Sequence, residues 1–315
     1  MLKYLTTLFA LFIIILSSSE ALSNMHGTRV DRYIRSGFAT ALTELKPLVA
    51  GEDAIAHYNL GAIYYRKELE QSVKWYRLAA EGGLAEAQFN LGVIYSNKEG
   101  ENRGFREAAK WYRLAAKQGF TFAQHNLGVM HDHGIGMLEN NTAALTWYQL
   151  AAEKGYAPAQ SNLGVLYAKG EGVSQDYEAA VRWFRLATKQ GHAKTYYNLG
   201  VLYEDDAVSL TGKITDATKL QTSFYWYRQA AERGVAKAQF NLGLMYAMGK
   251  GTHKNNQHAH VWFNLAGSKG LKLARHYRIK IEKQLTNIEI ARAKNFAKQW
   301  VTEHENQNQT NFTTQ

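Results

Sequence analysis

Asparagine recurs at one fixed position along this chain and is the first residue type to consider for chemistry. An Asn stands directly before a Leu-Gly pair six times, and an aromatic residue or His precedes that Asn in five of the six cases. An amide offers a donor and an acceptor without carrying a charge. Such a series suits either ligand binding or hydrogen bonds that tie adjacent repeats together, and the sequence leaves both open. The candidate partner-binding ladder consists of Asn59, Asn90, Asn126, Asn162, Asn198 and Asn241, with Tyr58, Phe89, His125, Tyr197 and Phe240 before them.

Basic side chains form a second series beside a recurring Trp. In three places a Lys or Arg comes one residue before the Trp, and in four places an Arg comes two residues after it. Residues three apart share a helix face, so we expect a basic ridge on a helical surface. The ridge is either a solvated face or a docking surface for an acidic partner or an anionic polymer. It consists of Lys74, Arg77, Lys110, Arg113, Arg182, Arg185 and Arg228.

Two histidine pairs and one acidic cluster are the remaining candidates for a reactive site. His131 and His133, like His258 and His260, lie two residues apart, and side chains at that spacing do not face each other on a helix. The acidic cluster Glu204–Asp206 lacks the alternating ligands and the Gly of a calcium-binding loop. The chain has no Cys, and it contains no serine elbow, phosphate-binding loop, Rossmann glycines or His-Glu-x-x-His. We therefore predict no metal, no cofactor and no catalytic residue.

The elements that must position these residues form an internal repeat. Six Trp-aromatic pairs are spaced 36, 36, 36, 43 and 36 residues apart, and a Gly follows each of these Trp residues by eight. Apolar residues within a unit recur at spacings of three and four on either side of a turn, which indicates two amphipathic helices. One such hairpin cannot bury its apolar faces alone, whereas stacked hairpins can. We therefore predict an all-α fold, a right-handed superhelical α-solenoid of about six helix-turn-helix repeats with N- and C-terminal capping helices, in which each Trp buries its indole.

The repeat resembles a known family. The pattern Ala-x-x-x-Leu-Gly-x-x-Tyr, a Gly-x-Gly turn and Ala-x-x-Trp-Tyr-x-x-Ala-Ala-x-x-Gly is similar to the Sel-one-like repeat, a relative of the tetratricopeptide repeat, over about residues 54–285. The resemblance implies a protein-binding scaffold, and in the related tetratricopeptide grooves first-helix Asn side chains bind peptide backbone or carboxylates. Some Sel-one-like proteins have been linked to β-lactam binding or hydrolysis, but those resemble cysteine-stapled variants, and this chain has no Cys.

The two ends of the chain differ from the repeats. Lys3, a run of twelve apolar residues over 5–16 and a small polar stretch have the layout of a signal peptide, and the run is too short for a permanent membrane span. Near the other end, Thr286 and Glu289 fit a capping box that opens a last helix. We expect this helix to place Ala293, Phe296 and Trp300 on one side, together with Leu285 just before it. The predicted segments are a signal peptide (1–23), an N-terminal capping half-repeat (24–50), the solenoid (51–285), a C-terminal capping helix (286–304) and a disordered tail (305–315).

These features predict a non-enzymatic scaffold or adaptor, periplasmic or secreted from a bacterium, that binds a protein or peptide and is monomeric. One alternative is a binder of anionic envelope polymer through the basic ridge, and another is a β-lactam-related hydrolase. The net charge of +10 favours anionic partners in general. A signal peptide disfavours nucleic acid as the partner whatever the charge, so we expect none.

Overall fold

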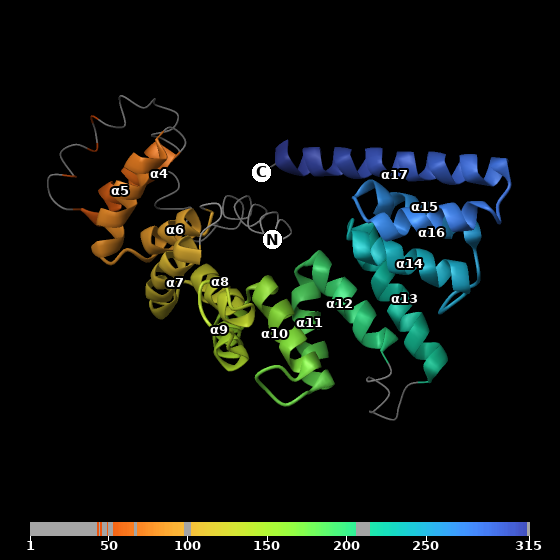
Figure 1. Ribbon diagram of the computed structural model, residues 1–315, viewed down its shortest axis with the longest axis horizontal. Coiled ribbons are helices and arrows are strands. Elements are labelled where there is room, and N and C mark those ends of the chain that lie inside the picture. Colours follow the sequence, from red (N-terminus) through yellow and green to blue (C-terminus); the bar gives the residue numbers. More distant parts are fainter. Residues whose placement is uncertain are drawn as a thin grey trace. The chain divides into compact units, whose positions relative to one another are not determined.

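The computed structural model describes residues 43, 45, 49, 53–65, 68–97, 102–205 and 215–313, with side chains except those of 102, 103 and 305–313. The predicted signal peptide and most of the predicted N-terminal capping half-repeat lie outside these residues. Every regular element in the described part is an α-helix, which confirms the all-α prediction (Figure 1). None of the described helices is both long and apolar enough to cross a membrane.

The chain divides into two compact units, 1–154 and 155–315. Within each unit the two helices of one repeat pack against each other, and each repeat packs against the next. The described helices of the first unit are α4 (Ala54–Tyr65), α5 (Leu69–Glu81), α6 (Ala85–Ser96), α7 (Asn102–Lys117), α8 (Thr121–Asp132) and α9 (Asn141–Glu153). Those of the second unit are α10 (Ala157–Lys169), α11 (Tyr177–Lys189), α12 (Ala193–Glu204), α13 (Asp216–Glu232), α14 (Ala236–Met248), α15 (Asn256–Ser268), α16 (Lys272–Glu282) and α17 (Asn287–Thr313).

Several second helices begin at a polar residue that caps their first turn. Asp176 accepts a hydrogen bond from the backbone N–H of Ala179 at the start of α11, and Asn140 and Asn255 cap α9 and α15 in the same way. A side-chain oxygen at this position satisfies one of the free N–H groups of the first turn. The capping box at the start of α17 is also confirmed, because Thr286 and Glu289 exchange hydrogen bonds.

The Gly-x-Gly turns bring the backbones of adjacent repeats together. The second glycine of two such turns, Gly136 and Gly251, has a positive φ and lies directly against the backbone of the preceding repeat, at Phe105 and at Leu220. A Cβ on Gly136 would come within 2.7 Å of the Phe105 carbonyl carbon. Only glycine allows this approach, so the turn fixes the spacing between repeats as well as the direction of the chain.

The aromatic core differs in one respect from the prediction. The Trp of each repeat is only half-buried in the first five repeats, and Trp262 in the sixth is buried. The residue after the Trp is instead the fully enclosed one, with 4% or less exposure in all six repeats. These enclosed rings are Tyr76, Tyr112, Tyr148, Phe184, Tyr227 and Phe263.

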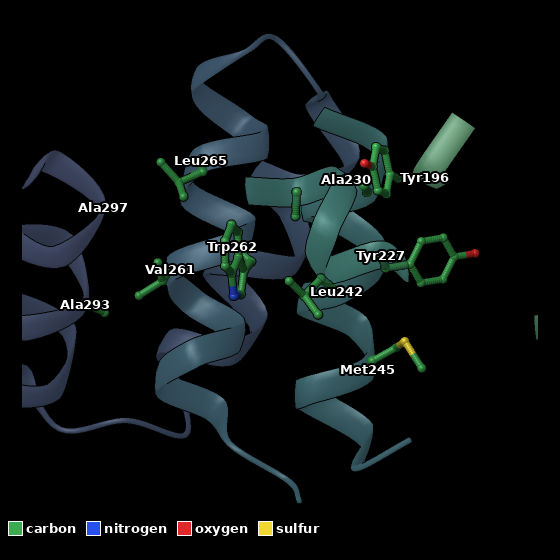
Figure 2. Packing of buried hydrophobic residues seen from close by; sticks show 12 residues of the cluster. Tyr196, Tyr227, Ala230, Leu242, Met245, Val261, Trp262, Leu265, Ala293 and Ala297 are labelled. Atoms are coloured by element: carbon green, nitrogen blue, oxygen red, sulfur yellow. The ribbon is translucent and has the colours of Figure 1, made fainter. Parts of the chain in front are cut away.

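Helix α17 covers the second helix of the sixth repeat. Its Ala293 and Ala297 are buried against Val261 and Leu265 of α15, and Figure 2 shows the two α15 side chains pointing toward α17. Trp300 packs on the same cluster. The prediction of this helix was therefore correct for Ala293 and Trp300.

Two details of that helix are corrected by the structure. Phe296 is 53% exposed, so Ala297 occupies the buried place predicted for it. The residues that face α15 follow the spacing 293, 297, 300 and 301, which leaves position 296 on the solvent side. The helix also continues to Thr313, beyond the predicted end at residue 304 and into the segment predicted to be disordered.

Candidate functional site

The enclosed aromatic ring of each repeat packs directly against the glycine of the Leu-Gly pair, and we call this glycine the seat of the ring. A Cβ added at any of these six helical glycines would come within 2.7 Å of a carbon of that ring. Real Cβ contacts are about 1 Å longer than this, so the ring occupies the space that any other residue would fill. The Asn two residues earlier points to a different side of the same helix, because side chains two apart do not share a helix face. The six seats are Gly61, Gly92, Gly128, Gly164, Gly200 and Gly243.

The aromatic residues of the predicted ladder lie against these same rings. Tyr58, Phe89, His125, Tyr197 and Phe240 each have a ring centroid 5.5 to 5.8 Å from that of the enclosed ring in their own repeat. Phe89, His125 and Phe240 are buried, and the two Tyr residues are partly buried. Such pairs add to the packing within a repeat.

Three of the six ladder amides contact the hydroxyl group of the enclosed tyrosine in the preceding repeat. The side chain of Asn126 hydrogen-bonds the Tyr112 hydroxyl, and Asn90 and Asn241 hold the same relation to Tyr76 and Tyr227. Burial raises the pKa of Tyr112 to about 12, and the hydrogen bonds from Ser96 and Asn126 oppose part of that rise. The phenol therefore stays neutral and donates or accepts within the array at ordinary pH.

The fourth repeat makes the contact between adjacent repeats without a tyrosine hydroxyl. Its enclosed ring is Phe184, which offers Asn198 no hydrogen-bond partner. Asn198 Nδ2 donates instead to Ser161 Oγ, at 3.3 Å. Ser161 is the one residue before a ladder Asn that is neither aromatic nor His. The two departures from the pattern thus compensate each other.

The ladder amides are therefore partly committed to contacts between repeats. Asn90, Asn162, Asn198 and Asn241 remain partly exposed, while Asn126 is 7% exposed. Asn59 is 2% exposed, and its Oδ1 has no hydrogen-bond partner among the described residues. Partner binding by these amides stays a prediction, and their structural contacts are now defined.

The seven residues of the basic ridge are all exposed, and several have partners within the chain. Arg77 donates to the Tyr95 hydroxyl of the next repeat at 2.6 Å. Lys110 and Arg228 form ion pairs with acids of their own helices at 2.7 and 2.8 Å, and the Arg182 pair is longer, at 4.0 Å. Arg113 lies near His131, where its charge adds to partial burial in lowering the pKa of the imidazole. The ridge is therefore a partly neutralised surface.

Sequence reasoning missed a series of side chains that clamp backbone carbonyls. Gln88, Gln124 and Gln239 each donate to a carbonyl eight residues earlier, at the end of a second helix, where the last carbonyls lack helical partners. Tyr196 and Arg275 do the same with a hydroxyl and a guanidinium. The signal was present as a Gln two residues before the ladder Asn in four of the six repeats.

A second series spans one whole repeat. In each repeat a Gly stands eight residues after the Trp, and we call it the terminal Gly. In four repeats the residue before this Gly donates a hydrogen bond to the carbonyl of the terminal Gly one repeat earlier, 35 residues away. We call these four contacts the staples. In the fifth repeat Arg233 stands at this position and lies over the Tyr196 ring, 4.2 Å from its centroid. The four staples run from Gln118 to Gly83, from Lys154 to Gly119, from Gln190 to Gly155 and from Lys269 to Gly234.

A row of exposed leucines is the most apolar feature of the second helices. Leu78, Leu114 and Leu150 stand three residues after the Trp of the first three repeats, and they are 46%, 45% and 38% exposed. Leu186, in the second unit, is 42% exposed at the same place in the fourth repeat. The equivalent in the sixth repeat is Leu265, which is 2% exposed because α17 covers it. We call Leu78, Leu114 and Leu150 the leucine row.

The candidate metal ligands do not gather into a site. Among the described residues, no three His, Asp or Glu side chains lie close enough together to hold a metal ion. His260 is fully buried, and its Nε2 lies 2.9 Å from Glu282 Oε1. Burial lowers the pKa of His260, and the Glu282 carboxylate opposes that shift. This pair links α15 to α16 and is accounted for by packing.

Comparisons with known proteins agree with the repeat geometry. The sequence matches the Sel1 repeat at six consecutive segments, 54–84, 85–120, 121–156, 157–192, 193–235 and 236–271. The crystal structure of a Sel1 repeat protein from Oxalobacter formigenes is similar with a TM-score of 0.58 and 30% sequence identity, over 72% of this chain and 66% of that one. The match thus spans just under two thirds of that relative's length.

A second solved structure is similar at lower values. It is a protective antigen of uropathogenic Escherichia coli with an SLR fold, at 22% identity and a TM-score of 0.45, over 90% of this chain and 85% of that one. No curated protein sequence matches the chain. Six contiguous repeats cover residues 54–271, well over half of the 315 residues. The chain therefore belongs to the Sel1 repeat family, whose repeats form protein-interaction scaffolds.

Proposed function

We propose that the chain is a non-enzymatic scaffold of the bacterial cell envelope, or a secreted one, that binds a helix of a partner protein across its leucine row. The observation that carries the proposal is the contrast between Leu265, covered by α17, and its exposed equivalents Leu78, Leu114 and Leu150. The last repeat thus shows what a helix bound to this face looks like.

The geometry of α17 indicates the chemistry of the partner. Two Ala residues four apart allow α17 to approach α15 closely, and Trp300 and Val301 extend the apolar contact. An amphipathic helix with small residues at this spacing has the same shape. In the sixth repeat Val261 precedes the Trp, whereas Lys74 and Lys110 hold that position beside the leucine row. We therefore expect acidic residues along the edge of the partner helix.

The predicted Asn ladder is the second candidate surface for the same function. Asn90 is partly exposed and lies between two repeats, so a bound peptide would share it with Tyr58 and Tyr76. The leucine row has no such competing contacts in the described residues beyond its own half-buried packing. For this reason we favour the row over the ladder and over binding of an anionic polymer to the ridge, whose charges are partly paired within the chain.

Site-specific photocrosslinking in cells of the source bacterium tests the proposal. A photoreactive residue placed at Leu114 or Leu150 is expected to give one discrete protein adduct, and the same residue at Asn90 or Asn126 is expected to give none. Leu138, which is 90% exposed and lies outside the row, is the matched control position. Adducts from the Asn positions alone would move the site to the ladder, and no protein adduct from either surface would refute the scaffold function.

Binding measurements with the identified partner give the magnitude. Each row leucine is about half-exposed, and full burial of a leucine side chain contributes roughly 1.5–3 kcal/mol, so completing the burial of two leucines is worth about 2 kcal/mol. Leu114→Ser with Leu150→Ser should therefore weaken binding by more than about tenfold. Leu138→Ser should leave the Kd unchanged. A loss as large in the control would mean that the effect is not specific to the row.

A further inference from the structure

Helix α16 ends the repeat series, and one position marks the end. Adding the usual 36-residue spacing to Leu242 and Gly243 of the sixth repeat gives Arg278 and Ile279. Ile279 thus stands where all six repeats have the glycine seat, and it is 53% exposed. No aromatic ring can take the seat when a branched side chain fills it. The exposed face of α16 is therefore closed to a seventh second helix and to the same helix of another copy of this chain.

That face combines basic and apolar side chains. Lys272, Leu273, His276, Ile279, Lys280 and Lys283 are all exposed, and their spacings of three and four residues place them on one side of α16 and its end. Leu273 and Ile279 are 52% and 53% exposed. The one acid of this helix, Glu282, is turned toward other groups, 2.9 Å from His260 Nε2 and 3.9 Å from Arg278 Nε. No carboxylate therefore offsets the positive charge of the face.

The charge of the whole chain is concentrated in the same region. Residues 269–298 contain nine Lys or Arg and two Glu, so this segment carries +7 of the net charge of +10. Both Glu residues are engaged, since Glu289 accepts hydrogen bonds from Thr286 at the start of α17. The partner of this face must therefore be strongly anionic.

The pattern of exposed groups indicates the class of partner. Lysine ammonium groups recognise negative charge as mobile point charges, without the fixed fork that arginine offers to a single carboxylate or phosphate. Leucine and isoleucine side chains between them need an apolar medium close to the charged layer. A helix with lysines beside exposed aliphatic side chains is typical of helices that lie in the headgroup region of a bilayer.

We propose that the exposed face of α16 binds the surface of a bilayer rich in anionic phospholipid. The lysines contact the headgroups, and Leu273 and Ile279 insert between them. The last repeat thereby attaches the scaffold to a membrane, while the leucine row in the first unit is a separate surface. The proposal does not depend on partner binding by that row.

Vesicle flotation with the full mature chain tests this proposal. The probes are vesicles of phosphatidylglycerol and phosphatidylcholine in equal parts, and vesicles of phosphatidylcholine alone. We expect binding to the first and none to the second, with affinity falling as salt rises. Each Lys near an anionic surface contributes about fivefold in affinity, so the Lys272→Gln, Lys280→Gln, Lys283→Gln variant should lose more than about tenfold. Leu273→Ser with Ile279→Ser should weaken binding while leaving the salt dependence in place.

The matched control removes the same charge from the basic ridge. The Lys74→Gln, Lys110→Gln, Arg182→Gln variant should bind anionic vesicles within about twofold of the parent chain. Both triple variants change only exposed side chains, and circular dichroism at rising temperature checks that each is folded. Equal losses in the two variants would overturn the assignment to α16, and binding to phosphatidylcholine alone would overturn the anionic specificity. A third outcome would also overturn the proposal. If the α16 triple variant still bound vesicles as the parent chain does but no longer gave a protein adduct in the photocrosslinking experiment in cells, the face would be a protein-binding site.

Discussion

Replacing one seat glycine by alanine has two effects of opposite sign on the free energy of unfolding. Gly128 lies in α8, and in a helix interior alanine is favoured over glycine by roughly 1 kcal/mol. If Gly128 were only a helical residue, Gly128→Ala would stabilise the protein. In the structure the new methyl group would lie 2.6 Å from Cδ1 of Tyr148.

The clash is the larger effect because the ring cannot move away. Tyr148 is 0% exposed, and its hydroxyl donates to Asp132 at 3.1 Å, so both ends of the side chain are held. Moving the ring by about 1 Å disturbs a close-packed core, and overpacking of this kind costs about 1–3 kcal/mol or more. After subtracting the gain in helix propensity, we expect Gly128→Ala to lower the free energy of unfolding by up to about 2 kcal/mol.

Urea unfolding followed by circular dichroism measures this change. Gly267→Ala in α15 is the matched control, because its new methyl would meet the Arg275 side chain, which is exposed and can shift. Because this shift also disturbs the Arg275 hydrogen bond to the Gly267 carbonyl, we expect the control to lose less stability than Gly128→Ala rather than to gain any. Tyr148→Leu, combined with Gly128→Ala, should recover part of the loss attributed to the clash, as a double-mutant cycle. An increase in stability for Gly128→Ala alone would refute the account of the glycine as a seat.

Three further outcomes are expected. Gln118→Ala removes the staple to the Gly83 carbonyl and the contact with Gln88, so it should cost about 1 kcal/mol in urea unfolding, while Gln149→Ala, which has a contact only within its own helix, should cost less. Burial lowers the pKa of His192 to about 4, so the imidazole stays neutral in the native state and the stability of the protein should fall as pH drops from about 6.5 toward 4. His192→Gln should reduce this fall, and an unchanged pH profile of stability would exclude His192 as its source. Burial raises the pKa of Tyr112 to about 12, so stability should be full below about pH 10 and fall above it, and Tyr112→Phe should reduce that fall in urea midpoints measured across the alkaline range.

The helices and their ends were predictable because the signals for them are local. Asp176 caps α11, and the Thr286–Glu289 capping box opens α17, since each depends on residues within one turn of the chain. Repetition removed the remaining ambiguity, because six copies in one phase cannot all be misread in the same way.

The partners of the repeating residues were not predictable from the same signals. Each staple ends on a backbone carbonyl, which has no sequence identity, so the spacing of 35 residues could not single out the acceptor. Whether the Trp or the following aromatic is enclosed depends on which of two neighbouring positions faces the seat glycine, and both residues are large and apolar. Phe296 was assigned to the buried side because it follows Ala293 by three residues and precedes Trp300 by four, but the small Ala297 takes the place against α15. The sequence left the Asn ladder open between ligand binding and contacts with the neighbouring repeat; Asn126 and Asn198 do make contacts with the neighbouring repeat, and partner binding by the ladder stays a prediction.

The staples also determine how the protein would respond to force. Each one joins the end of a repeat to the end of the repeat before it, so tension along the chain is resisted by one repeat at a time rather than by the whole array. When a staple breaks and its repeat unravels, about 36 residues are released, which corresponds to an extension of roughly 120 Å at about 3.4 Å per residue. The repeat before it keeps its own staple, whereas the repeat after it loses the carbonyl to which its staple was bound. Extended from its two ends, the protein would therefore lengthen in steps of about one repeat, and the fifth repeat, which has Arg233 in place of a staple and is seven residues longer, would give a different step.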